Sequence, residues 1–67
     1  MRFNLVLMKK LRQEHGYTQA QLANILGYTS EACYRGKEKG AYNFNVNDLY
    51  LLSKLYSIQI EDMLIED

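Results

Sequence analysis

The stretch TQAQLANILGYTSEACYRGK, residues 18–37, decides the fold because it predicts two short helices joined by a glycine turn. In the first helix, the Thr18 hydroxyl can accept a hydrogen bond at the helix start while Gln21 reaches back, which is the reciprocal T-x-x-Q capping box. This helix is predicted over residues 19–26. Gly27 ends it and supplies the turn, since glycine adopts left-handed backbone conformations without steric cost.

The second helix of the pair is predicted over residues 31–37, where Thr29 or Ser30 can provide the N-cap. Gly36 lies inside this helix and costs about 1 kcal/mol relative to alanine, so we expect the helix to fray early. Ala23 in the preceding helix is small enough to let the two helices approach closely. A short second helix on a compact support is the arrangement in which a helix-turn-helix unit presents that helix to the major groove of DNA.

A further helix is predicted before this pair, over residues 4–15, and Gly16 ends it. Its start is open, because apolar residues at that point also alternate as they would in a strand: Phe3, Leu5 and Leu7. The basic side chains of this helix are expected to form a solvated face, with contact to DNA as the alternative: Lys9, Lys10 and Arg12.

Two more helices are predicted in the second half of the chain. Asn45, with Asp48 three residues later, gives the N-terminal signature of a helix that continues to Tyr56. A short last helix is predicted over residues 60–65, with acidic side chains in its first turn. A chain of 67 residues is long enough for one domain. We therefore expect an all-α, compact five-helix domain over residues 1–67, with its helix-turn-helix unit at about 18–37.

The formal net charge of zero hides an asymmetry between the two halves of the chain. Up to Gly40, seven basic and three acidic side chains give +4, whereas from Ala41 onward one basic and five acidic side chains give −4. An acidic closing half that faces away from a duplex would orient the domain by repulsion from phosphate. The basic half would supply only modest attraction, so non-specific affinity is expected to be weak.

The sequence gives no indication of catalytic or metal-binding chemistry. Cys33 and His15 are the only residues of their kinds, too few for an internal disulfide or a structural zinc site. No nucleophile has a base at a fixed spacing and no glycine-rich phosphate loop occurs, so no enzyme activity, metal or cofactor is expected. No apolar run approaches the roughly 18 residues of a membrane-spanning helix, and we expect a soluble cytoplasmic protein without membrane contact.

Three stretches taken together carry a family resemblance: LRQEHGYTQAQLANILGY at 11–28, KEKG at 37–40 and LLSKLYSIQIEDML at 51–64. On these residues the chain resembles the phage Cro and repressor-like, or XRE-type, helix-turn-helix family over nearly its whole length. The resemblance implies a five-helix, all-α DNA-binding domain, commonly a homodimeric transcription regulator.

One departure from the family pattern shifts the face of the second helix of the pair. The segment between Gly27 and Glu38 is one residue longer than the commonest pattern, so Tyr34 rather than Cys33 falls on the core-facing position four before Glu38. Glu38 itself is expected to brace the fold. Cys33 is then most simply a small buried or half-buried residue.

Seven residues are candidates for DNA contact. Gln19 and Ser30, each at the start of a helix, would hydrogen-bond phosphates, although Gln19 also fits a plain surface residue. Glu31 would accept a hydrogen bond from a cytosine amino group, and Arg35 would read guanine or pair with phosphate. The others would give one apolar contact and two phosphate contacts: Ala32, Lys37 and Lys39.

Two functions stay open at this point. The first is a sequence-specific transcriptional regulator, a repressor, that binds double-stranded DNA as a homodimer with its recognition helices about 34 Å apart. Its dimer face is expected on the last helix, which carries more apolar surface than a monomer buries: Ile58, Ile60, Met63, Leu64 and Ile65. The second is a protein-interaction module, antirepressor-like or antitoxin-like, that binds DNA weakly and takes a protein partner. It is motivated by the residues at base-reading positions: Glu31, Ala32 and Gly36.

Overall fold

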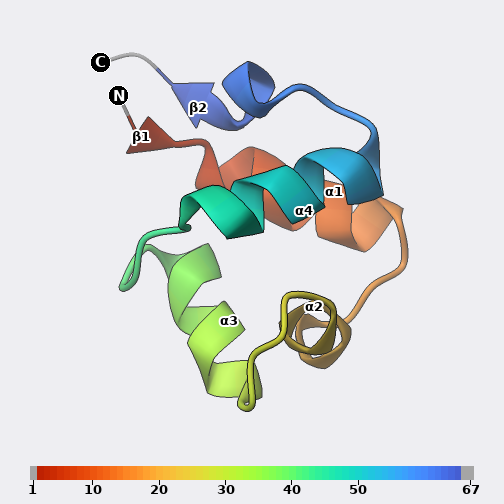
Figure 1. Ribbon diagram of the computed structural model, residues 1–67, viewed down its shortest axis with the longest axis vertical. Helices are drawn as coiled ribbons and strands as arrows, with labels where there is room; N and C mark the ends of the chain where they lie inside the picture. Colours follow the sequence, from red (N-terminus) through yellow and green to blue (C-terminus); the bar gives the residue numbers. More distant parts are fainter. Residues whose placement is uncertain (1, 66–67) are drawn as a thin grey trace.

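The computed structural model describes residues 2–65, and over these residues the chain is mainly helical (Figure 1). The all-α class is confirmed, with four α-helices rather than five among the described residues. A single turn of 3₁₀-helix, η1, and a two-stranded sheet complete the fold. In chain order the elements are β1 Arg2–Phe3, α1 Leu5–Glu14, α2 Gln19–Ile25, α3 Glu31–Lys39, α4 Val46–Tyr56, η1 Ile60–Met63 and β2 Leu64–Ile65.

The helix pair occupies one end of the molecule, and strands β1 and β2 occupy the other (Figure 1). Helices α1 and α4 cross the middle, with α2 and α3 below them in the view and η1 and β2 above. A core common to all these layers holds them together: Met8, Leu22, Ala23, Leu26, Tyr34, Phe44, Leu52, Tyr56 and Met63. The unit formed by α2 and α3 therefore projects from a support built by the rest of the chain.

The helix starts follow from local capping, as the sequence predicts. At α2, Thr18 and Gln21 form the reciprocal capping box, and at α4, Asn45 and Asp48 form a second one. The Ser30 hydroxyl accepts a hydrogen bond from the backbone N–H of Ala32 at the start of α3. These contacts satisfy backbone N–H groups that the first turn of a helix leaves without a partner.

Helix α3 does not fray at Gly36, and that expectation was wrong. It continues to Lys39 and ends at Gly40, whose φ of 89° is left-handed. A Cβ atom added to Gly36 would lie 2.5 Å from ring carbons of Tyr42, so glycine leaves the space that this ring fills. The Gly36 carbonyl also accepts hydrogen bonds from the backbone N–H groups of Ala41 and Tyr42. Gly36 thus serves the turn after α3 rather than ending the helix.

The predicted last helix was also wrong over its final residues. Only Ile60–Met63 is helical, as a single 3₁₀ turn, and Leu64 and Ile65 instead form strand β2, antiparallel to β1. The Asn4 backbone N–H donates to the Met63 carbonyl and continues this pairing. The strand-like alternation near Phe3 was the sequence signal for β1. Glu66 and Asp67, which contribute to the acidic charge of this half, lie outside the described residues.

The expected inward shift within α3 is confirmed. Tyr34 is fully buried in the core, whereas Cys33 is half-buried. Because side chains three and four residues apart share a helix face, Tyr34 also turns Lys37 and Glu38 inward. Both are buried in the structure.

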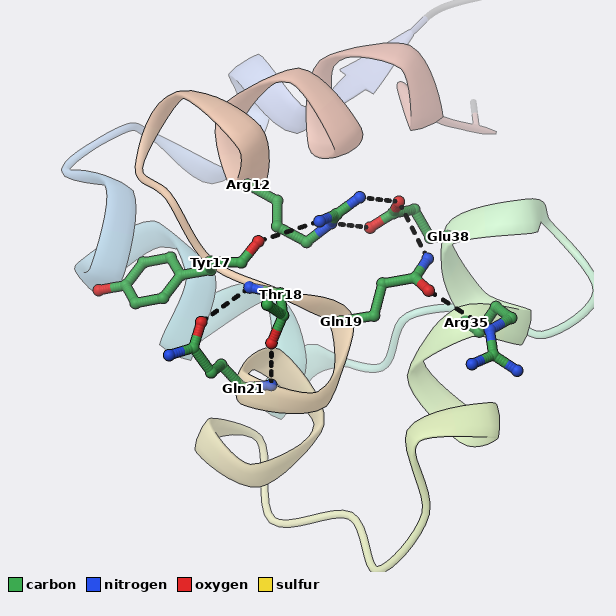
Figure 2. A network of polar contacts seen from close by, with 7 residues as sticks. All are labelled: Arg12, Tyr17, Thr18, Gln19, Gln21, Arg35 and Glu38. Atoms are coloured by element: carbon green, nitrogen blue, oxygen red, sulfur yellow. Dashed lines mark hydrogen bonds and ion pairs between the residues drawn. The ribbon is translucent and has the colours of Figure 1, made fainter.

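A buried ion pair joins α1 to α3. The Arg12 guanidinium donates from Nε and Nη2 to the two Glu38 carboxylate oxygens, at 2.9 and 3.1 Å, and from Nη1 to the Tyr17 carbonyl at 3.0 Å (Figure 2). The two side chains are only 12% and 5% exposed. Glu38 braces the fold as expected, but the prediction that Arg12 lies on a solvated face was wrong.

Removing one partner of this pair should destabilise the domain strongly. We expect Glu38→Leu to lower the free energy of unfolding by about 3–5 kcal/mol, because it leaves the Arg12 charge buried and unpaired. The double variant Arg12→Met, Glu38→Leu should recover most of this loss. Urea unfolding followed by circular dichroism measures both, and a double variant no more stable than Glu38→Leu would contradict this role of the pair.

Candidate nucleic-acid interface

The N-terminal half of α3 carries most of the candidate residues: Ser30 at its cap, Glu31 and Ala32 in its first turn, and Arg35 one turn later. Close packing of α2 against α3 supports it, because Ala23 is small and buried, as predicted. Gly27, with a φ of 84°, makes the turn that sets the two helices at an angle. The Glu31 and Ala32 side chains at this end are exposed, and Ser30 caps the helix beside them.

Arg35 and Glu31 form one ion pair on this surface. The distance from Arg35 Nη2 to Glu31 Oε2 is 2.5 Å, across one turn of α3, and both side chains remain about 44% and 43% exposed. The two residues therefore present an acceptor and a donor side by side, with no net charge. The sequence suggested them as two separate readers, and their i, i+4 spacing was the signal that they pair.

Gln19 lies between Arg35 of this outer pair and Glu38 of the buried pair (Figure 2). Its carbonyl Oε1 accepts from Arg35 Nε at 3.3 Å, and its Nε2 donates to Glu38 Oε1 at 3.4 Å. The Gln19 side chain is half-buried, so the alternative that Gln19 is a plain surface residue is excluded. Both ends of its amide are occupied within the domain.

Lys37 is a correction to the predicted phosphate contacts. Its side chain is 9% exposed, and its Nζ lies 2.5 Å from Asp48 Oδ2 and donates to the Tyr28 hydroxyl at 2.5 Å. Tyr28 in turn donates to the other oxygen of Asp48. The ammonium thus joins the turn, α3 and α4 from inside. Because Lys37 lies three residues after core-facing Tyr34, the sequence could have shown that its side chain points inward.

Lys39 remains the exposed lysine on α3. It lies in the last turn of the helix, beside Gly40, where a cation is also favoured by the helix dipole. Ala32 is exposed in the first turn. At Gly36, the ring of Tyr42 fills the space that a side chain would take. The geometry keeps five of the predicted residues on or next to one surface: Ser30, Glu31, Ala32, Arg35 and Lys39.

The two buried pairs change the proton affinity of their members. Burial alone raises the pKa of Glu38, but the hydrogen bonds from Arg12 hold it below the ordinary value of 4.5. Burial likewise raises the pKa of Asp48, and hydrogen bonds from Lys37 and Tyr28 hold it below 3.8. Burial lowers the pKa of Lys37, whereas the hydrogen bonds to Asp48 and Tyr28 bring it above 10.5. All three groups are therefore charged at neutral pH.

Other kinds of site are not found in the part of the chain that the structure describes. Among residues 2–65 there is no group of three side chains able to hold a metal ion. None of the described helices is long and apolar enough to cross a membrane.

Comparison with known proteins adds one finding to this geometry. Residues 8–63 match the model of a helix-turn-helix family. The match runs from the middle of α1 through η1, and so includes both buried ion pairs and the exposed start of α3. No curated protein and no solved structure matches the chain.

Acid should destabilise the domain through its two buried carboxylates. A carboxyl whose pKa is lowered by folding contributes stability above its unfolded pKa and loses it as the pH falls through the folded pKa. We expect the free energy of unfolding to fall as the pH drops below the ordinary values of 4.5 for Glu38 and 3.8 for Asp48. Urea unfolding between about pH 7 and pH 3 measures it.

The variant Asp48→Asn separates this effect from general acid sensitivity. It should be less stable than the wild type at neutral pH, and the difference should shrink in acid. Asp62→Asn, at an exposed carboxylate on η1, is the matched control and should keep the wild-type acid dependence. A difference between wild type and Asp48→Asn that stays constant with pH would contradict the assignment.

Proposed function

The chain belongs to the XRE-type, Cro- and repressor-like helix-turn-helix family of DNA-binding transcription regulators, and we propose that it is a sequence-specific repressor whose α3 enters the major groove. One observation carries this proposal. The outer face of the N-terminal half of α3 bears a half-exposed pair of acceptor and donor, Glu31 and Arg35, while the C-terminal half of the helix is fixed by buried ion pairs. A reading helix needs such a free start on a rigid support.

The five residues of this surface would have two roles, contact with bases and contact with phosphates. Arg35 would donate to guanine, Glu31 would accept from a cytosine amino group, and Ala32 would offer an apolar contact to a thymine methyl group. Ser30 and Lys39 would contact phosphates, which positions the helix without reading sequence. Lys37 has no part in this set, because its ammonium is buried against Asp48.

The position of the acidic segment supports this orientation on DNA. Glu61 and Asp62 are exposed in η1, at the end of the molecule opposite α2 and α3 (Figure 1). The Asp48 carboxylate is buried and neutralised by Lys37. Repulsion from phosphate therefore acts mainly on the end that faces away from the duplex.

We further propose that the repressor acts as a homodimer. The described chain measures 31 × 24 × 19 Å, so one copy spans a single half-site of an operator whose half-sites are about 34 Å apart. The dimer face expected on the last helix is less well supported, because some of its apolar residues are engaged within the monomer. Met63 is fully buried in the core of the monomer, and Leu64 and Ile65 pair with β1.

A protein-interaction module is the second candidate. It is favoured by the same Glu31–Arg35 pair, since these two charges compensate each other on the outer face of α3. A neutral surface of this kind attracts phosphate weakly and would also suit a protein partner. Binding to DNA discriminates between the two functions.

Selection of bound sequences from a random duplex pool should enrich a motif with palindromic half-sites. On the enriched duplex, affinity should fall linearly with the logarithm of the salt concentration, and Lys39→Ala should reduce that slope by about 1. Fluorescence anisotropy measures both. Lys54→Ala, on the exposed side of α4, is the charge-matched control and should leave the slope unchanged. Failure to enrich any motif would favour the protein-interaction module.

The stoichiometry on the enriched duplex tests the homodimer. We expect two chains per operator by analytical ultracentrifugation, and one chain on a duplex that carries a single half-site. Binding to the half-site should be much weaker, because one copy makes only half of the contacts. One chain per full operator at saturation would rule out the dimer.

A further inference from the structure

An unbroken series of polar contacts links the interior of the domain to the outer face of α3. It begins at the buried pair of Arg12 and Glu38, passes through the Gln19 amide, and ends at Arg35 with its partner Glu31. Figure 2 shows the Gln19 side chain between Glu38 and Arg35. Three helices contribute to the series, and only its last two members are substantially exposed.

We propose that Gln19 is a positioning residue for Arg35, and that it presets the guanidinium to read one guanine in the operator. This inference rests on the proposed function, because it assigns a role to Gln19 within the same DNA-binding surface. It replaces the phosphate contact expected for Gln19 from the sequence.

The chemistry of the two neighbours requires an amide at this position. A carboxylate only accepts hydrogen bonds and a guanidinium only donates them, so the residue between Glu38 and Arg35 must donate to one and accept from the other. Glutamine does both with a single side chain. Glutamate would repel Glu38, lysine would repel Arg35, and a methionine of similar length would make neither bond.

The contacts also determine which edge of Arg35 is left for a base. Gln19 Oε1 takes the Nε hydrogen and Glu31 Oε2 takes a hydrogen of Nη2, while Nη1 has no partner among residues 2–65. The terminal edge of a guanidinium carries parallel N–H groups that match the N7 and O6 acceptors of guanine. Because Gln19 and Glu31 hold the other edge, this one would be the edge turned toward the groove.

The series acts through geometry more than through energy. The two bonds of Gln19 measure 3.3 and 3.4 Å, which are long for hydrogen bonds, so each contributes little to stability. Arg12 and Glu38 are fixed by burial and by two mutual hydrogen bonds. Without Gln19, the Arg35 side chain would be held only by the exposed Glu31 carboxylate. The contact with Gln19 fixes the guanidinium relative to the buried pair, and preorganisation of this kind favours one base over others.

Gln19→Met tests the inference, with Gln13→Met on the exposed face of α1 as the matched control. Affinity is measured by fluorescence anisotropy for the enriched duplex, for the same duplex with one G·C pair replaced, and for a random duplex. We expect Gln19→Met to reduce the preference for that guanine roughly tenfold, while binding to the random duplex and its salt slope stay unchanged. Thermal unfolding confirms that both variants are folded.

A double-mutant cycle with Arg35 separates positioning from a structural role. Arg35→Lys keeps the charge but loses the paired donors, so it should remove the guanine preference by itself. Adding Gln19→Met to Arg35→Lys should then change nothing further, because the two residues act as a unit. A merely structural effect of Gln19 would add to that of Arg35→Lys in full.

The outcomes distinguish the inference from the proposed function. Equal weakening on all three duplexes would show that Gln19 contacts phosphate, and an unchanged guanine preference would show that it does not position Arg35. Either result overturns the inference and leaves the repressor intact. If the wild type prefers no sequence at all, the proposed function fails and the inference fails with it.

Discussion

The buried ion pair of Arg12 and Glu38 is the interaction on which the rest of the structure depends. Removing two charges from water costs several kcal/mol for each ion, so such a pair persists only with well-matched hydrogen bonds. Here the guanidinium makes two bonds to the carboxylate and a third to the Tyr17 carbonyl. The pair fixes the position of α3 relative to α1. Helix α3 cannot slide or rotate relative to α1 without leaving both charges buried and unpaired, which ties the candidate reading surface to the core.

The second buried pair completes this constraint. Lys37 and Glu38 are consecutive and therefore point about 100° apart around the helix axis, toward two different supports. Glu38 meets Arg12 on α1, and Lys37 meets Asp48 on α4. The C-terminal half of α3 is thus held from two sides, whereas its first turn carries exposed side chains. This division explains why one predicted phosphate contact, Lys37, lies in the interior while Lys39, two residues later, lies outside.

Local signals made much of the fold predictable from the sequence. The capping boxes at Thr18 and Asn45 depend on residues three apart. The inward position of Tyr34 followed from the resemblance to the family pattern, in which the residue four before Glu38 faces the core. The buried pairs were missed because their members are 26 and 11 residues apart, and a charged residue on a helix is by default solvated. The sheet between the two ends of the chain was missed for the same reason. Within the candidate site, the sequence identified the surface of α3, but the pairing of Arg35 with Glu31 and Gln19 depends on tertiary positions.

The ion pairs also change the meaning of the charge asymmetry. Of the seven basic residues before Gly40, Arg12 and Lys37 are neutralised inside the domain, and Arg35 is compensated by Glu31. Glu31 and Glu38 are already counted in the +4 of this half, so only the pairing of Lys37 with Asp48 lowers that charge, by one, to +3. On α3 itself, the three pairs leave Lys39 as the basic side chain that is exposed and takes part in none of them. Since phosphate contacts supply most non-specific affinity, such a domain would bind random DNA weakly and would rely on base contacts for its operator. A single short helix offers few base contacts, and a second copy doubles them without adding charge to either reading surface.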